Sequence, residues 1–394
     1  MTREPRNQTC HSHDASDTEV AISPRPVLRP VRNAAPGPGS AVVVKTRCEA
    51  EEVLRQPEIY SSAGRLLPGG LRPVPPIELD PPAHAAWRAV LDPLFAPSRA
   101  GQLASTISRL ARELIDEFAN EQEIDFAARF SIPLPAQTLM TLFGLPLEDL
   151  PWFLDLKDGV IRPNRVLGKP SDDPEVIAYQ ATMTAEAYGY FGEALDSREA
   201  DSRGDLLSAF LDLEIDGAPV DRDSLLDLCF GLLVEGIEPM SAALDCAFLC
   251  LAENPEYRKE VVATPRRAIE ELLRWATPVT FVTRTAAADT VLGGCPVSAG
   301  QRVRVLLSEA NVDPVAGLDA SVLRWNRTVN THLAFGTGIH RCLGSHLARI
   351  QLAIALREWH SRIPHYSVAR PDELAFTPGV RTVDRFPMWL GKQL

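Results

Sequence analysis

The sequence predicts a mainly α-helical protein with a small β portion, folded as one large domain. The chain has 394 residues, of which 45% are hydrophobic, enough to form a large core. Apolar residues recur with a period near 3.6 over most of the chain, and short strand patterns cluster in the second half. No internal repeat or linker divides residues 41–394. We therefore expect one domain there, after a flexible polar and Pro-rich tail over residues 1–40.

The expected helices account for most of this domain. They cover Cys48–Arg55, Pro82–Leu94, Ala100–Ala119, Phe126–Phe143, Pro174–Ser197, Ser224–Ala252, Thr264–Trp275 and Cys342–Ile363. Gly236 and Pro239 should interrupt the long apolar helix Ser224–Ala252 at its middle. The expected strands are Ala41–Val44, Thr280–Ala286, Thr290–Val291 and Arg302–Leu307. The Gly/Pro-rich loop Ser61–Ile77 is longer than an ordinary connection, which suggests a functional loop.

Charge and composition exclude several classes of function. The net charge of −12 and the lack of a Lys/Arg block disfavour a nucleic-acid or anionic-membrane partner. No stretch of about 18 apolar residues and no signal peptide is recognisable, so we expect no membrane anchor. Seven scattered cysteines indicate a reducing cytoplasm rather than a disulfide framework. Cys10, His11 and His13 could bind a metal, but a flexible tail would not fix their geometry.

The segment Phe335–Gly344 carries the clearest chemistry: Phe-Gly-Thr-Gly-Ile-His-Arg-Cys-Leu-Gly. Gly336 and Gly338 allow a tight bend that brings the backbone close to a flat ligand. Cys342 follows at the head of a predicted helix, where the helix dipole and free backbone N–H groups stabilise a thiolate.

Three interpretations of Cys342 compete. It could be a buried structural cysteine, or a zinc ligand with His340 and His346, although that set lacks a fourth ligand. The third interpretation makes the Cys342 thiolate the axial ligand of a haem iron.

The ten-residue segment resembles the haem-binding loop of the cytochrome P450 family, the haem-thiolate monooxygenases. It meets every position of the family pattern Phe-Gly-x-Gly-x-His/Arg-x-Cys-x-Gly. Glu271 and Arg274 match the family's Glu-x-x-Arg, and Arg327 fits the arginine that completes this brace. The resemblance spans residues 41–394 and implies a P450 fold, haem b as cofactor and Cys342 as the iron ligand. Haem-binding positions in the loop are then Phe335, Gly336, His340, Cys342 and Gly344.

The resemblance also implies partners for the two haem propionates, which need cationic or hydrogen-bonding groups. The matching residues are His84 and Arg88 on one predicted helix, Arg284 on a predicted strand and His332 before the loop. His340 is a fifth candidate.

The segment Glu235–Met240 departs from the family motif Ala/Gly-Gly-x-Asp/Glu-Thr-Thr. Gly236 and Glu238 match, but Pro239 and Met240 replace the two threonines. In the family the first threonine helps deliver protons during oxygen activation. Proline has no hydroxyl and no N–H, so it also frees the carbonyl of Glu235. We therefore assign Glu238 and Pro239 as catalytic positions, with three routes open: ordered water with Glu238, a substrate hydroxyl, or hydrogen peroxide as oxidant.

By family register, the substrate contacts are mostly apolar. They are Leu233, Gly236, Ile237, Val279, Phe281 and Val282. They favour an apolar, medium-sized substrate such as a terpenoid, steroid, polyketide or aromatic compound. Glu235 and Arg72 are either polar anchors or solvent-facing.

The resemblance implies an enzyme that inserts one oxygen atom of O2 into a C–H bond. No flavin or iron–sulfur motif is present, so a separate ferredoxin or flavodoxin should supply electrons, docking near Cys342 at Arg341 and Arg349. Three alternatives remain: a tailoring enzyme that demethylates, couples or desaturates its substrate, a peroxide-driven oxidase, and a non-catalytic haem-binding or auxiliary protein of the same fold.

Overall fold

A computed structural model describes residues 41–64, 67–313, 320–325, 327, 330–377 and 379–391. The predicted tail over residues 1–40, with Cys10, His11 and His13, lies outside the described residues. No described helix is long and apolar enough to cross a membrane.

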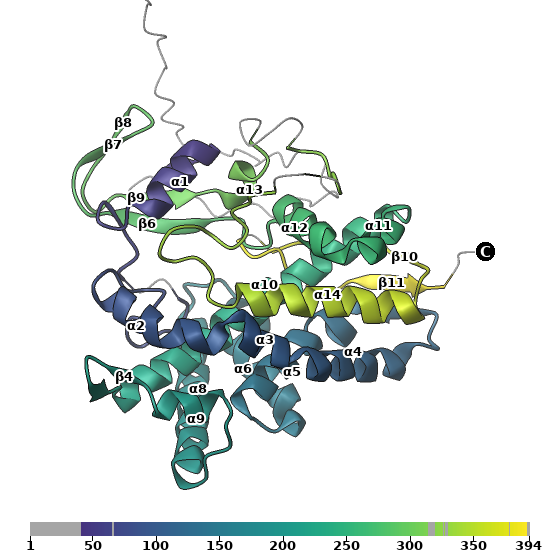
Figure 1. The fold of residues 1–394 in the computed structure, drawn as a ribbon, viewed down its shortest axis with the longest axis horizontal. Helices are drawn as coiled ribbons and strands as arrows, with labels where there is room; N and C mark the ends of the chain where they lie inside the picture. Colours follow the sequence, from purple (N-terminus) through teal and green to yellow (C-terminus); the bar gives the residue numbers. More distant parts are fainter. Residues whose placement is uncertain are drawn as a thin grey trace, which may run out of the picture.

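Helices form most of the structure, as predicted (Figure 1). In the first half they are α1 (Arg47–Arg55), α2 (Ala83–Leu91), α3 (Pro97–Gln102), α4 (Ala104–Phe118), α5 (Pro133–Phe143), α6 (Leu150–Ile161), α7 (Pro163–Leu167) and α8 (Pro174–Ala200). In the second half they are α9 (Leu206–Leu211), α10 (Arg222–Glu253), α11 (Tyr257–Ala263), α12 (Pro265–Ala276), α13 (Leu307–Ala310) and α14 (Ser345–Arg362). A π-helix, η2, covers Ala127–Ser131. Short 3₁₀ turns cover Asp92–Phe95, Leu147–Asp149 and Pro371–Glu373.

The strands form small separate sheets. The largest sheet has the order β1 (Val42–Val44), β9 (Arg302–Val305), β6 (Val282–Ala286) and β2 (Tyr60–Ser61), in which only β1 and β9 are parallel. An antiparallel sheet joins β10 (Tyr366–Val368), β11 (Pro387–Leu390) and β3 (Glu123–Asp125). Two hairpins pair β4 (Glu214–Ile215) with β5 (Ala218–Pro219), and β7 (Thr290–Leu292) with β8 (Cys295–Val297).

Several predicted helices are divided or begin later than expected. The predicted segment Ala100–Ala119 is divided between α3 and α4. Phe126–Phe143 is divided between η2 and α5, because Pro133 at the start of α5 has no backbone N–H to donate to the preceding turn. The predicted helix from Cys342 begins only at Ser345, with Gly344 at its N-cap.

The long helix α10 corrects a further expectation, because it continues through Pro239 without interruption. A proline inside a helix costs about 3 kcal/mol relative to alanine. Packing offsets this cost, since almost every residue from Leu225 to Ala252 is buried against neighbouring elements. Helix α10 therefore crosses the molecule as one rigid element.

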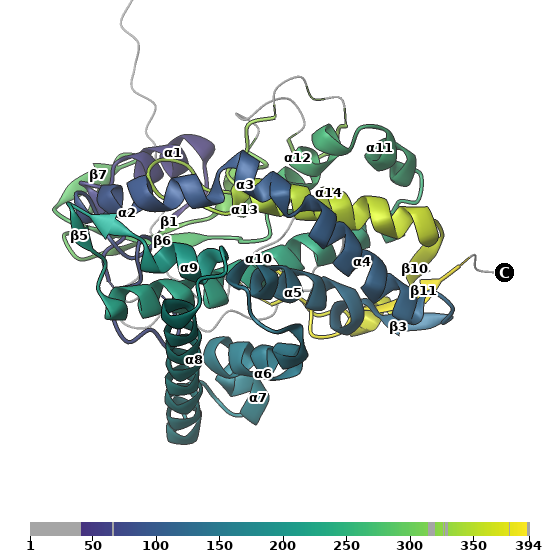
Figure 2. The same ribbon diagram turned by 60° about the horizontal axis from the view of Figure 1, so that its bottom comes forward.

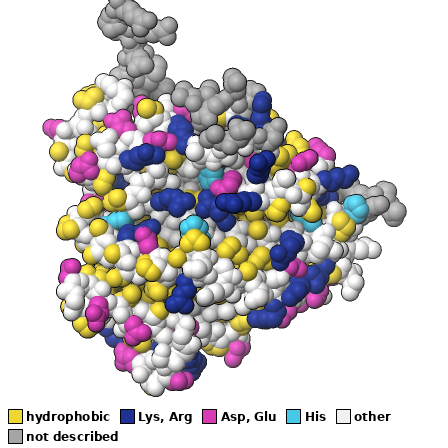
Figure 3. Space-filling model, viewed as in Figure 1, with side chains coloured by type: hydrophobic (Ala, Val, Ile, Leu, Met, Phe, Trp, Pro, Cys, Tyr) yellow, Lys and Arg dark blue, Asp and Glu magenta, His cyan; other side chains and the backbone are white. Residues whose placement is uncertain are grey.

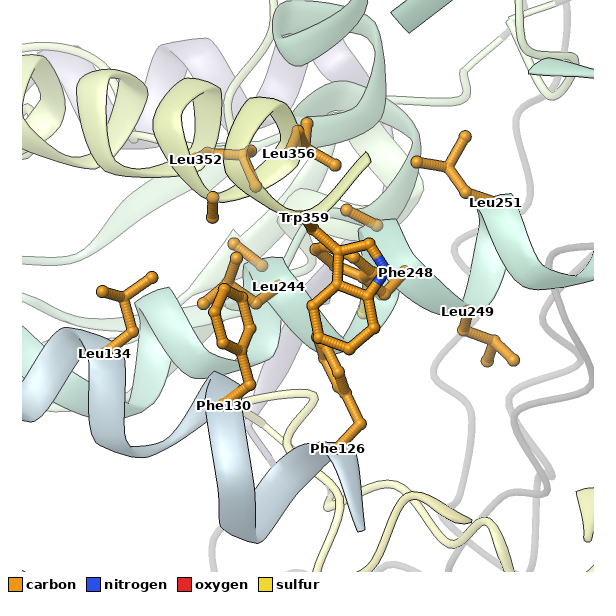
Figure 4. Close-up of a cluster of buried hydrophobic side chains, with 14 of the residues drawn as sticks. Phe126, Phe130, Leu134, Leu244, Phe248, Leu249, Leu251, Leu352, Leu356 and Trp359 are labelled. Atoms are coloured by element: carbon orange, nitrogen blue, oxygen red, sulfur yellow. The ribbon is translucent and has the colours of Figure 1, made fainter. Parts of the chain in front are cut away.

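The largest hydrophobic cluster joins α10 to α14 and to η2 (Figure 4). Trp359 of α14 packs its ring against Phe126, Phe130 and Phe248, with centroids 5.1 Å away in each case. These rings are fully buried, and aromatic pairs in this geometry add to the free energy of burial. The cluster fixes α14 relative to α10, and thereby fixes the loop that precedes α14.

Helices α4 and α12 contribute to the same cluster, whereas other helices lie away from it. Helices α8, α6 and α7 project together from one end of the molecule, opposite the sheet that contains β1 and β6 (Figures 1 and 2). Of the described cysteines, Cys48, Cys229, Cys246, Cys250 and Cys342 are free thiols, whereas Cys295 is disulfide-bonded. The sequence, which indicated a reducing compartment without a disulfide framework, did not lead us to expect the disulfide at Cys295.

Candidate active site

The loop before α14 is shaped by two glycines and closed by a backbone hydrogen bond. Gly336 and Gly338 have φ values of 67° and 72°, in the left-handed region that favours glycine. A Cβ atom at Gly338 would lie 2.2 Å from the carbonyl oxygen of Leu54, so the loop can approach the end of α1 only with glycine there. The N–H of Cys342 donates to the carbonyl of Phe335 at 2.8 Å, which closes the loop.

Cys342 lies at the end of this loop, three residues before α14. Its side chain is accessible, yet burial raises the pKa of its thiol, while the backbone N–H of Gly344 acts in the opposite direction. The accessibility of the Cys342 side chain and the effect of burial on its pKa are consistent with each other if the side chain borders an internal space rather than the outside of the molecule. The negative charge of Glu235 also raises the pKa of Cys342, so Glu235 faces the same space from α10.

The wall contributed by α10 is a single stripe of residues. From Asp227 to Ala252, a stretch described in full, four residues are not buried: Leu232, Glu235, Gly236 and Pro239. Their spacing of three, one and three places them on one face of the helix. The centre of α10 therefore presents an acidic side chain, a glycine and the predicted Pro239 to the cavity.

The other predicted residues of α10 point away from this stripe. Leu233 and Ile237 are fully buried in a hydrophobic cluster, and helical periodicity directs them about 100° or more from the stripe. Glu238 is 6% exposed and forms ion pairs with Arg162 and, at 3.7 Å, with Lys157. The structure thus places Glu238 beside α6 rather than on the face that carries Pro239.

Sequence analysis did not single out Lys157 and Arg162, because no motif marks them. The sequence feature that could have indicated them is a lysine within an otherwise largely apolar helix. In the structure, Lys157 of α6 is only 1% exposed. Arg162 also pairs with the exposed Asp384, at 3.3 Å. An ion-pair chain therefore runs from the surface at Asp384 through Arg162 to Glu238.

Four of the predicted propionate partners lie close together. The rings of His84 and His340 are 4.3 Å apart, and Nε2 of each is buried without a hydrogen-bond partner among the described residues. Burial and the positive charges of Arg284 and His84 lower the pKa of His340 to about 3. Burial and the positive charge of Arg88 likewise lower the pKa of His84. Both imidazoles are therefore neutral at pH 7, and each can donate one hydrogen bond.

The two arginines of this group differ in their partners. Arg88 pairs with Asp92 at 2.8 Å and donates to the carbonyl of Arg341 at 2.8 Å. Arg284 is buried and forms no ion pair within the described part of the chain, and burial lowers its pKa to about 10. The guanidinium of Arg284 is buried without a carboxylate partner, and the Nε2 atoms of His84 and His340 have no hydrogen-bond partner among the described residues. These groups fit a ligand that carries carboxylates. The propionates of haem are such groups, so these residues fit haem.

His332 has a different partner from the predicted one. Its Nε2 lies 3.0 Å from Oε2 of Glu270. The two carboxylate oxygens of Glu270 also accept hydrogen bonds from Arg349, at 2.5 Å to Oε1 and 2.9 Å to Oε2. Burial favours the neutral form of Glu270, but the bonds from His332 and Arg349 outweigh it and lower its pKa to about 2. Sequence analysis missed Glu270 because the neighbouring Glu271 alone belongs to the recognised motif.

The predicted brace of Glu271, Arg274 and Arg327 is confirmed in geometry. Glu271 is 1% exposed and accepts hydrogen bonds from Arg274 at 2.7 and 2.8 Å and from Arg327 at 3.0 and 3.1 Å. Arg274 also donates to backbone carbonyls of Asn311 and Val322. The brace thus connects α12 to the segment that leads into the Cys342 loop.

The predicted substrate contacts after α12 are partly buried. Val279 pairs as an isolated β-bridge with Val380. The ring of Phe281 packs under the guanidinium of Arg304, at 4.6 Å. Val282 packs against the hydrophobic cluster of the β1–β9 sheet. Arg72, the other possible anchor, is bound to Asp223 and Asp227 at 2.9 and 2.7 Å.

The zinc interpretation lacks a ligand set. Among the described residues, no three His, Cys, Asp or Glu side chains converge in a way that could hold a metal ion. His340 instead contacts His84, and Cys342 faces the α10 stripe. A haem, which brings its own nitrogen ligands and needs one protein thiolate, fits this arrangement.

Comparison with known proteins identifies the family. The sequence model of the family described as Cytochrome P450 matches residues 266–359. The chain is 32% identical over 324 residues to the mycinamicin IV hydroxylase/epoxidase of Micromonospora griseorubida, covering 80% of this chain and 78% of that protein. It is 31% identical over 330 residues to a steroid C26-monooxygenase of Mycobacterium tuberculosis, covering 81% of this chain and 86% of that protein.

Solved structures agree with these relatives. The hydroxylase HmtN, involved in himastatin biosynthesis, superposes with a TM-score of 0.76 at 27% identity, covering 89% of this chain and 91% of that chain. CYP109E1 from Bacillus megaterium, in complex with testosterone, gives a TM-score of 0.78 at 26% identity, covering 89% and 92%. The chain therefore belongs to the cytochrome P450 family and is a haem-dependent monooxygenase, an oxidoreductase that uses O2 and a redox partner.

Proposed function

We propose that this enzyme binds haem b through Cys342 and hydroxylates an apolar substrate of steroid or polyketide size. The observation that carries the proposal is the accessible Cys342 beside a group of residues suited to carboxylates: His84 and His340, whose buried Nε2 atoms have no hydrogen-bond partner, and the buried Arg284, which forms no ion pair, within the described part of the chain. The relatives named for mycinamicin, steroid and himastatin chemistry support the substrate class. Terpenoid and aromatic compounds of similar size are equally apolar, so they also belong to the proposed substrate class.

The residues of the site would divide the work. His84, Arg284 and His340 would hold the propionates, with Arg88 beside them, and Cys342 would supply the thiolate ligand. When bound, the haem iron supplies O2 binding and reduction. The overall reaction consumes O2, two electrons and two protons, inserts one oxygen atom into a C–H bond and releases the other as water.

Oxygen activation also needs a supply of protons on the side of the haem that the centre of α10 would face. We assign it to ordered water and Glu238, since Pro239 has no hydroxyl. The ion-pair chain from Asp384 through Arg162 gives Glu238 a connection to the surface. Arg162 and Lys157 also hold the Glu238 carboxylate in place beside α6, and ordered water would connect it to the face that carries Pro239.

We propose a ferredoxin or flavodoxin as the electron donor, docking over the Cys342 loop. Arg and Lys side chains gather across the middle of the face that carries α14 (Figure 3). Arg47, Arg55, Arg341 and Arg349 line a hollow of about 280 Å³ beside the loop. Since Arg349 is paired with Glu270, Arg55 and Arg341 are the more exposed charges for an acidic partner.

The test combines spectroscopy with isotope labelling. The reduced, carbon monoxide-bound enzyme should show the Soret band of a thiolate-ligated haem; the band of a histidine-ligated haem would contradict the proposal. With a ferredoxin system, ¹⁸O2 and a steroid or macrolactone substrate, the product should contain one ¹⁸O atom. Label incorporated only from H2¹⁸O2 would instead identify peroxide-driven oxidation, one of the routes left open by the lack of a hydroxyl at Pro239.

A further inference from the structure

Glu235 is the acidic residue of the site that the proposed function leaves without a task. It lies on the α10 stripe, is accessible on the cavity side and faces the space that contains Cys342. The rest of that stripe consists of Leu232, Gly236 and Pro239, which carry no polar side chain. A carboxylate is thus presented to a cavity whose wall on α10 is otherwise apolar.

The acidic residues around Glu235 all have partners. Glu238 pairs with Arg162 and Lys157, and Glu78 accepts hydrogen bonds from the backbone N–H groups of Leu67 and Val74 at 2.6 and 2.8 Å. Glu235 has no hydrogen bond or ion pair among the described residues. Glu235 therefore adds no hydrogen bond or ion pair to the fold within the described part of the chain, so folding alone does not explain a carboxylate on this otherwise apolar stripe.

The local charges favour a cation as the missing partner. Burial and the negative charges of Glu238 and Glu78 raise the pKa of Glu235 to about 7. The charged groups that act on it most are therefore acidic, and the thiol of Cys342 adds no positive charge. A neutral hydrogen-bond donor would satisfy the carboxylate only in part, whereas an ammonium would also relieve the repulsion.

We propose that Glu235 binds a basic nitrogen of the substrate, so that the enzyme oxidises an apolar molecule carrying a protonated amine. This inference rests on the proposed function, because it assigns a feature of the substrate to that same cavity. Glu235 would then be a specificity-determining residue, orienting the apolar part of the substrate by a salt bridge from one helix.

The test uses a matched pair of probes and a calorimeter. One probe is a steroid carrying a trimethylammonium group, and the other carries the neutral, isosteric tert-butyl group at the same carbon. A quaternary nitrogen cannot bind the iron and does not titrate. Dissociation constants would be measured on the haem-loaded wild type, on Glu235→Gln, and on Glu253→Gln as a control at the exposed end of α10.

We expect the wild type to bind the cationic probe at least tenfold more tightly than the neutral probe. In Glu235→Gln the ratio of the two dissociation constants should fall to near one, whereas Glu253→Gln should keep the wild-type ratio. The preference should also rise about tenfold from pH 6 to pH 8, as a carboxyl with a pKa of about 7 ionises. No preference in the wild type, or one retained in Glu235→Gln, would overturn the inference.

Two other outcomes would also overturn it. A resting absorption spectrum that shows carboxylate ligation of the iron in the wild type, and loses it in Glu235→Gln, would make Glu235 an iron ligand. Unchanged cation binding with a lower yield of product per electron in Glu235→Gln would make it a proton donor. Failure of the proposed function is distinguishable, because it would remove the thiolate Soret band or the ¹⁸O label while leaving the binding preference intact.

Discussion

The two walls of the cavity, the Cys342 loop and the centre of α10, keep their geometry by different means. The loop is held by polar contacts: the Glu271 brace, the Glu270–Arg349 pair and the backbone bond that closes at Cys342. The centre of α10 is held by apolar packing on almost every side, which keeps the helix continuous through Pro239. The ligand side, which is the Cys342 loop, depends on particular polar residues. The oxygen side, which is the centre of α10, depends on packing everywhere except at its stripe of accessible residues, so substitutions there need not disturb the helix.

The largest expected effect is on the loop itself. In Cys342→Ser the thiolate Soret band of the reduced, carbon monoxide-bound enzyme should disappear and monooxygenase turnover should be lost, because serine provides no sulfur ligand. Cys48→Ser, which changes an exposed free thiol, is the matched control and should keep both signals. A Cys342→Ser enzyme that retained the band would place the ligand elsewhere.

The second prediction concerns the brace behind the loop. Glu271→Gln leaves Arg274 buried without its carboxylate, so the free energy of unfolding should fall by about 3–5 kcal/mol in denaturant titrations. The exposed i,i+4 pair of Arg109 and Glu113 provides the comparison, and Glu113→Gln should cost less than about 1 kcal/mol. Equal losses in the two variants would mean that the polar brace does not stabilise the loop side.

Sequence motifs predicted the loop side well, and the reason is physical. Gly336, Gly338 and Cys342 are each required by a backbone conformation or by the ligand chemistry, so residue type alone identifies them. The i,i+3 spacing of Glu271 and Arg274 likewise fixes their contact within one helix. Local geometry was thus readable without knowing the fold.

The oxygen side was predicted less completely, because its features depend on what packs around α10. Leu233 and Glu235 lie two residues apart, and only burial by neighbouring helices decides that Leu233 faces the core and Glu235 the cavity. The partners of Glu238 come from α6 and lie 76 or more residues away along the chain, beyond any local pattern. The expected interruption at Pro239 was wrong for the same reason, since packing overrides propensity.

The third prediction tests the acidic residue that α10 turns towards α6. If Glu238 relays protons, Glu238→Gln should lower coupled turnover by about 100-fold, because the amide keeps the shape but cannot take up and release a proton. The thiolate Soret band should change little and the solvent deuterium isotope effect should increase. The thermal midpoint should fall, because Arg162 and the buried Lys157 lose their partner carboxylate. Glu117→Gln, on an exposed face of α4, is the control. A normal rate in Glu238→Gln would leave only water or the substrate as the proton source.

The smallest effect is expected at Pro239. Pro239→Thr adds a hydroxyl on the open stripe and restores an N–H that can bond to the carbonyl of Glu235, four residues earlier. The fraction of reducing equivalents recovered in product should rise by about two- to fivefold, well below the roughly 100-fold that a positioned proton donor can contribute to a rate, because ordered water would already deliver protons. The measurement is product formed per NADPH consumed, with peroxide release followed in parallel. Unchanged coupling and an unchanged product spectrum would show that Pro239 plays no part in proton delivery. The stripe would then act on the substrate alone, through the shape of Gly236 and the charge of Glu235.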